Sequence, residues 1–189
     1  MIYSIALFLH ITGALMLFAS ISIEWLCVIN MRNSTVVETI KESIFNYSKL
    51  TAINLTAMIL ILIPGIYMMA VVWKNASWIS IAFIGIILLA VVGGAVTGRK
   101  MKIIKKIMSK ENNISPLLRS LLNDNSLMLS IKMRTTISLG IIFLMAVKPD
   151  MIGSIVTLVT SVIIGFLPLK TKTRTSEVME AGRKVDQEY

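Results

Sequence analysis

Residues 2–29 read IYSIALFLHITGALMLFASISIEWLCVI, an almost unbroken apolar run. A helix that crosses a bilayer needs about 20 mostly apolar residues, because the hydrocarbon core is about 30 Å thick. The run has no Lys or Arg before it, and it is longer than the apolar region of a signal peptide, which is about 7–15 residues. We therefore expect a retained transmembrane helix in this stretch.

The composition of the whole chain extends this expectation. Of its 189 residues, 56% are hydrophobic and 15% are charged, whereas about 25% of the residues of a soluble domain are charged. A disordered chain and an ordinary soluble enzyme are excluded by these proportions, and the single Cys27 excludes a disulfide scaffold. The sequence predicts an all-α, polytopic membrane bundle over residues 1–169, with five transmembrane helices at about 2–29, 50–73, 78–97, 127–147 and 151–169.

The positive charges alternate between the two sides of these five helices. One side, which includes a basic loop at 98–126 and a polar tail at 170–189, carries 17 of the 19 Lys and Arg residues. Positive residues favour the cytoplasmic side of the plasma membrane, so we expect the N-terminus outside and the C-terminus in the cytoplasm. The alternative is a three-span protein, in which the last two helices re-enter without crossing.

The basic loop begins with RKMKIIKKIMSK, at residues 99–110. At helical spacing its apolar and basic residues separate into two faces, so this stretch can lie in the membrane interface and bind anionic lipids. The alternative is a topology signal alone, and nucleic acid is not expected because no aromatic residue interrupts the stretch. The candidates for contact with lipid headgroups are Arg99, Lys100, Lys102, Lys105, Lys106 and Lys110.

Polar residues inside the expected helices are costly in lipid and are candidates for function. His10, Gly13, Leu17, Ser20 and Glu24 recur at steps of three and four residues, so they share one face of the first helix. We expect Glu24 to pair with Arg134 or Lys132; the alternative is that these charges reach the headgroups separately. The intramembrane polar candidates are His10, Ser20, Glu24, Asn54, Lys132 and Arg134.

The only histidine, His10, has three alternative roles. It can form a hydrogen bond between helices, hold haem b or copper, or take part in a proton relay. A thioether together with an imidazole suits copper or haem, so the candidate metal or haem ligands are His10, Met68 and Met69.

Small residues and caps predict how the helices pack and where they begin. Gly94 and Gly98 form a pair that allows close approach of another helix, as does a stripe on the last helix, Ser154, Thr157, Ser161 and Gly165. Ser115-Pro116 predicts a short helix to about residue 122, and Asn-Asp-Asn at 123–125 is expected to end it and to cap the transmembrane helix that follows. Pro149 is expected to start the last helix.

The stretch LFLHITGAL at 7–15, followed by PGIYMM at 64–69, resembles uncharacterised families of small bacterial multi-pass membrane proteins. It also resembles, over His10 and Gly13, the copper-resistance protein D-like family and the membrane protoporphyrinogen-oxidase-like family. The resemblance implies a membrane helix bundle, and for the last of these families it implies bound haem b.

The sequence contains no catalytic motif, so we expect a non-enzymatic structural, assembly or transport-accessory protein in the membrane. One alternative is a haem- or copper-binding redox protein that uses His10. The other is a small transporter or proton-coupled channel that uses His10, Asn54, Glu24 and Arg134. Expected partners are the bilayer and its anionic lipids, with a second copy or another membrane protein as a further alternative.

Overall fold

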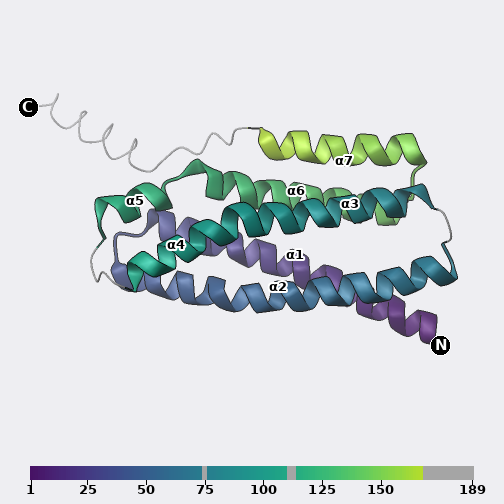
Figure 1. Cartoon of the computed structure of the whole chain (residues 1–189), viewed down its shortest axis with the longest axis horizontal. Helices are drawn as coiled ribbons and strands as arrows, with labels where there is room; N and C mark the ends of the chain where they lie inside the picture. Colours follow the sequence, from purple (N-terminus) through teal and green to yellow (C-terminus); the bar gives the residue numbers. More distant parts are fainter. Residues whose placement is uncertain (74–75, 110–113, 168–189) are drawn as a thin grey trace, which may run out of the picture.

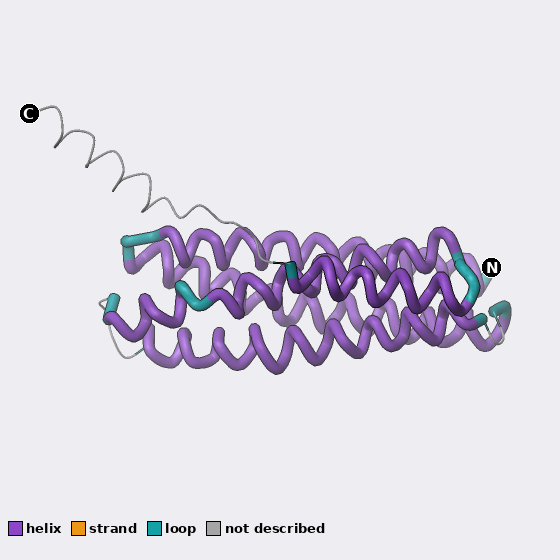
Figure 2. Tube along the Cα trace, turned by 90° about the horizontal axis from the view of Figure 1, so that it is seen from above, coloured by secondary structure: helices purple, strands orange, loops and turns teal. Residues whose placement is uncertain are grey.

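A computed structural model describes residues 1–73, 76–109 and 114–167. These residues form helices and no strand, as the sequence predicts, and the helices run along one common direction (Figures 1 and 2). Their bounds are α1 Ile2–Asn33, α2 Val37–Val71, α3 Ser77–Val92, η1 Gly93–Gly98, α4 Arg99–Met108, α5 Pro116–Leu122, α6 Asn125–Val147 and α7 Met151–Phe166.

Four helices are long and apolar enough to cross a membrane, which is compatible with a multi-pass membrane protein. They are Ile2–Asn33, Val37–Val71, Ser77–Met108 and Pro116–Val147, the last of which includes α5. The fifth apolar helix, α7, has only 16 residues, and the expected end of this span at 168–169 lies outside the described residues.

The connections on the basic side are shorter than the stretches between the predicted spans, because most of these residues are helical, as expected for 99–108 and 116–122 but not for 37–49. The connection expected before residue 50 contracts to Ser34–Val36, since α2 begins at Val37. The expected loop 98–126 contains α4 and α5, and α4 continues α3 through the π-helical η1 as a single helix (Figure 1). The stretch from Arg99 therefore extends the spanning helix and does not lie across its end.

These extensions, which we call the basic end of the bundle, carry part of its continuous hydrophobic core. This part contains Met31 of α1, Ile40 of α2, Ile104 of α4, Leu118 of α5 and Leu127 of α6, all at most 1% exposed. With 7 residues, α5 is too short to be stable alone in water, so this shared core is what holds it helical, whereas α4 also continues from α3. The predicted starts of α5 and α6 are confirmed, with caps at Ser115 and Asp124.

The opposite end, which we call the aromatic end, holds the α2–α3 and α6–α7 connections and Met1 (Figure 1). Trp73 and Trp78 meet edge to face with centroids 5.7 Å apart. Lys148 ends α6 in the left-handed conformation (φ 51°) and places its ammonium 4.2 Å from the centroid of the Trp73 ring. Asp150 caps α7 and accepts a hydrogen bond from the N–H of Gly153, so the helix starts after Pro149 rather than at it.

Close helix packing depends on glycines other than the predicted pair. A Cβ added to Gly94 would meet nothing within 4 Å and one added to Gly98 would meet only the Gly93 carbonyl oxygen of the same helix, so no other described helix of the chain approaches this pair. The stripe on α7 does pack on α6: a Cβ on Gly165 would lie 3.0 Å from the Met133 Cα. The helices α1 and α2 approach closely at Gly13, where a Cβ would lie 2.8 Å from the Leu60 Cβ.

Candidate functional site: a charge cluster inside the bundle

Glu24 lies on the face of α1 that is turned into the bundle. Gly13, Leu17, Ser20 and Glu24 are all buried on this face, as their spacing predicts, and His10 is half-buried. Glu24 is 1% exposed. An ionised carboxylate so deeply buried is stable only when it is paired and hydrogen-bonded.

Two other helices supply the partners of Glu24. Arg134 of α6 donates from Nη1 to Oε2 of Glu24, and Asn54 of α2 donates from Nδ2 to Oε1. The side chains of Arg134 and Glu24 are 8% and 2% exposed, so their charges neutralise each other away from solvent. The three residues, which we call the charge cluster, join α1, α2 and α6 at one level.

Arg134 lies against the π-helical turn η1. A Cβ added to Gly93 would lie 3.2 Å from Nε of Arg134, so the missing side chain makes room for the guanidinium. Next to it, the carbonyl of Val92 accepts a hydrogen bond from Ser130 Oγ at 3.2 Å. The hydroxyls of Ser130 and Thr97 lie 2.6 Å apart, and Thr97 is fully buried. A π-turn displaces carbonyls from their usual helical partners, and these hydroxyls supply an alternative donor.

The helix α6 has a buried polar face that was not predicted from the sequence. Ser130, Arg134 and Ser138 are all buried and follow each other at steps of four residues. That spacing was visible in the sequence, but only Lys132 and Arg134 were considered as polar candidates on this helix. The structure thus places a polar stripe of α6 opposite the stripe of α1.

Three buried polar atoms of the described residues have no hydrogen-bond partner: Ser20 Oγ, Asn54 Oδ1 and Ser138 Oγ. Ser20 is one helical turn from Glu24, and Asn54 binds Glu24 directly. Buried polar groups in native proteins are seldom left unpaired. The charge cluster is therefore bordered by hydrogen-bonding capacity that the described side chains do not use.

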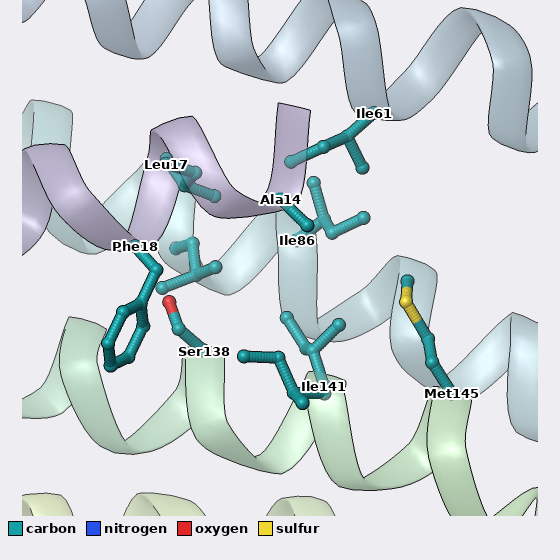
Figure 3. A pocket seen from close by; sticks show the side chains of 10 residues that line it. Ala14, Leu17, Phe18, Ile61, Ile86, Ser138, Ile141 and Met145 are labelled. Atoms are coloured by element: carbon teal, nitrogen blue, oxygen red, sulfur yellow. The ribbon is translucent and has the colours of Figure 1, made fainter. Parts of the chain in front are cut away.

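Ser138 lines a cavity of about 30 Å³ on the side of the charge cluster that faces the aromatic end. All the other lining side chains are apolar, among them Leu17, Phe18 and Ile61 (Figure 3). A cavity of this size can hold a water molecule, but a bound water needs about 2–4 polar partners. The cavity between the charge cluster and His10 is consequently lined by apolar side chains apart from Ser138.

His10 joins α1 to α2 nearer the aromatic end. Its Nδ1 lies 2.8 Å from the carbonyl oxygen of Ile61, and because a carbonyl only accepts, Nδ1 carries the proton. Gly65 lies beside the ring, where a Cβ would come within 3.2 Å of His10 Nδ1 and Cε1. Pro64, which lies inside α2, has no N–H of its own to donate in this turn.

The candidate metal or haem ligands are placed as follows. Nε2 is the ring nitrogen of His10 that remains for a metal, since Nδ1 donates to Ile61. Met68 is buried at 8% exposure, whereas Met69 is 39% exposed and faces away from the bundle. Within residues 1–73, 76–109 and 114–167 no three His, Cys, Asp or Glu side chains lie close enough to hold a metal ion. Haem b or copper at His10 stays a prediction.

Lys132 is not a partner of Glu24. Its Nζ donates to the carbonyl of Leu167, the residue after the last turn of α7. A cation at this position satisfies a free carbonyl and interacts favourably with the helix dipole. Of the two partners predicted for Glu24, the structure therefore selects Arg134.

Other charges hold the basic end together. Lys100 contacts Asp124 and Ser126, and the Lys100 hydrogen bond and the Ser126 N–H lower the pKa of Asp124 to about 2. Arg119 donates to the carbonyl of Ser34 at 2.7 Å. Arg99, Lys102, Lys105 and Lys106 are exposed, and Lys110 lies outside the described residues.

Comparisons with known proteins add no assignment. The chain matches no family model, no curated protein and no solved structure. The family resemblance of residues 7–15 and 64–69 therefore stays a prediction.

Proposed function

We propose that the chain is a non-enzymatic protein of the plasma membrane that acts as a structural, assembly or transport-accessory component. The observation that carries this proposal is the charge cluster, in which Glu24 and Arg134 neutralise each other inside the bundle. Its three residues tie three helices together, and the mostly apolar cavity at Ser138 lies between them and His10. Such an arrangement supports a role in holding a fixed bundle.

We further propose five spans, with the N-terminus outside and the basic end in the cytoplasm. The strong excess of Lys and Arg on one side and the Trp73–Trp78 pair at the other end support this orientation. The 16 residues of α7 extend over about 24 Å, less than the hydrocarbon core of about 30 Å. Local thinning of the bilayer accommodates a short helix at modest cost.

Labelling of single cysteines tests this orientation. With Cys27 replaced by Ala, we expect a membrane-impermeant maleimide to label Met151→Cys in intact cells. Lys105→Cys, at the basic end, should be labelled only after the cells are permeabilised. The reverse pattern would overturn the orientation, and a C-terminal tag reached by antibody from outside would leave α7 without a full crossing.

A second candidate is a small transporter or proton-coupled channel. The unpaired Ser20 Oγ and Asn54 Oδ1 favour it, because both border the carboxylate of Glu24 and offer acceptor sites to a proton carrier or a cation. Proteoliposomes with an internal pH-sensitive dye test this function. Proton flux that disappears in Glu24→Gln would support the channel, and a flux equal to that of empty liposomes would leave the structural role.

A further inference from the structure

Among the residues that the structure describes, four cations of α4 have no anionic partner. Lys100 is held by Asp124, but Arg99, Lys102, Lys105 and Lys106 are exposed, and none of them forms an ion pair with another described residue. No Asp or Glu occurs between residues 77 and 110. The remaining acids on a packed helix, Glu38 and Glu42, lie at the start of α2.

The direction of these cations is fixed by the core. Met101, Ile104 and Met108 are buried in the basic end, which turns the basic face of α4 outward. Because α4 continues α3, the same face extends back along the helix into the apolar region, where Gly94 and Ala95 are exposed. A Cβ on Gly94 would meet nothing within 4 Å, so no neighbouring group covers the helix at this point.

The positions of these residues along the membrane normal follow from the rise of about 1.5 Å per helical residue. If Trp78 marks the outer boundary, about 20 residues cross the hydrocarbon core, which places Arg99 at the inner boundary. Lys102 then lies about 5 Å beyond it, and Lys105 and Lys106 lie about 10 Å beyond it, near the Debye length of about 8 Å. Gly94 and Ala95 lie within the inner leaflet.

We propose that this face binds an anionic phospholipid of the inner leaflet. Arg99 and Lys102 contact its phosphate, and one acyl chain packs against the uncovered helix surface at Gly94 and Ala95. Lys105 and Lys106 add only long-range attraction. This inference rests on the proposed membrane orientation and goes beyond it, because it assigns a ligand to two particular cations.

The full chain in nanodiscs tests the proposal, with phosphatidylcholine alone or mixed with phosphatidylglycerol, and native mass spectrometry to measure bound lipid. Each cation near the surface contributes about 1 kcal/mol, so Arg99→Gln/Lys102→Gln should weaken binding of phosphatidylglycerol by about thirty-fold. Lys105→Gln/Lys106→Gln removes the same charge and should weaken it by no more than about threefold. Gly94→Leu should also displace the lipid while the bundle stays folded.

Three results would overturn the proposal. Equal losses in the two double variants would mean diffuse attraction only, and equal binding of both lipids would mean no anion site. Competition by free inorganic phosphate as strong as by the lipid would mean an anion site without a lipid. Any of these results with unchanged cysteine labelling leaves the proposed orientation intact, whereas labelling of Lys105→Cys from outside removes both.

Discussion

Replacing Glu24 by Gln is expected to lower the free energy of unfolding by about 3 kcal/mol or more, because Arg134 is left as an uncompensated buried charge. For a chain of this size, such a loss corresponds to a fall of about 10 °C in the thermal unfolding midpoint. Arg134→Gln should cost a similar amount, since it leaves the carboxylate 1% exposed and without its cation. Thermal unfolding of the detergent-solubilised variants measures both effects.

The double variant Glu24→Gln/Arg134→Gln distinguishes a pair from two independent charges. Two amides can still hydrogen-bond to each other and to Asn54, so most of the lost stability should return. Glu38→Gln, at an exposed position of α2, is the matched control and should change the midpoint little. Strictly additive losses in the double variant would contradict the paired arrangement.

The same double variant separates the two proposed functions. A structural role needs only a neutral, hydrogen-bonded contact, so a stable double variant should retain its cellular role. A transport role needs the titratable carboxylate, so a stable double variant should have lost its proton flux. The comparison holds because stability and flux are measured on one protein.

The members of the charge cluster could be predicted from the sequence, because a charged side chain inside a lipid bilayer needs a partner of opposite charge. Glu24 and Asn54 were identified because each is polar inside an apolar run, and the choice between Arg134 and Lys132 was left open. That choice depends on rotation of α6: Arg134 lies in step with Ser130 and Ser138, whereas Lys132 is turned toward α7. Helix rotation follows from packing against neighbours, which a single sequence does not specify.

The helix ends on the basic side show a different limit. Residues 37–49 and 99–108 contain many charged residues, so hydropathy placed them outside the spans. Helical spacing indicated a helix in the second stretch but was not applied to the first, and both are helical. Their apolar residues, such as Ile40 and Ile104, are spaced for one buried face and are fully buried in the same hydrophobic core. Hydropathy averages over the whole circumference of a helix and therefore underestimates a helix that is apolar on one face only.

The glycines show a third limit. GGAVTG contains the recognised small-residue spacing, but it forms a π-turn whose Gly93 makes room for Arg134, while Gly94 faces open space. The close contact between helices occurs instead at Gly13, which has no such motif. A spacing rule identifies a surface that permits close approach, and only the packing of the other helices decides whether one arrives.

Gly13→Ala should therefore destabilise the bundle. The new Cβ would lie 2.8 Å from the Leu60 Cβ and 3.0 Å from both the Ala57 carbonyl oxygen and the Ile61 nitrogen. Two of these three atoms belong to the backbone of α2, so no side-chain rotation relieves the contact and α2 must move. Overpacking of this kind costs about 1–3 kcal/mol, measured as a fall in the thermal unfolding midpoint.

The displacement of α2 would also disturb both polar contacts between α1 and α2. His10, one helical turn from Gly13, forms a hydrogen bond with Ile61. Farther along the same interface, Glu24 forms a hydrogen bond with Asn54. Gly94→Ala is the matched control, because it meets nothing within 4 Å and a helical Ala is favoured over Gly by about 1 kcal/mol. A midpoint that falls in Gly13→Ala and is kept or raised in Gly94→Ala would locate the tight contact at the α1–α2 crossing. Equal changes in both would mean that the helices approach each other elsewhere.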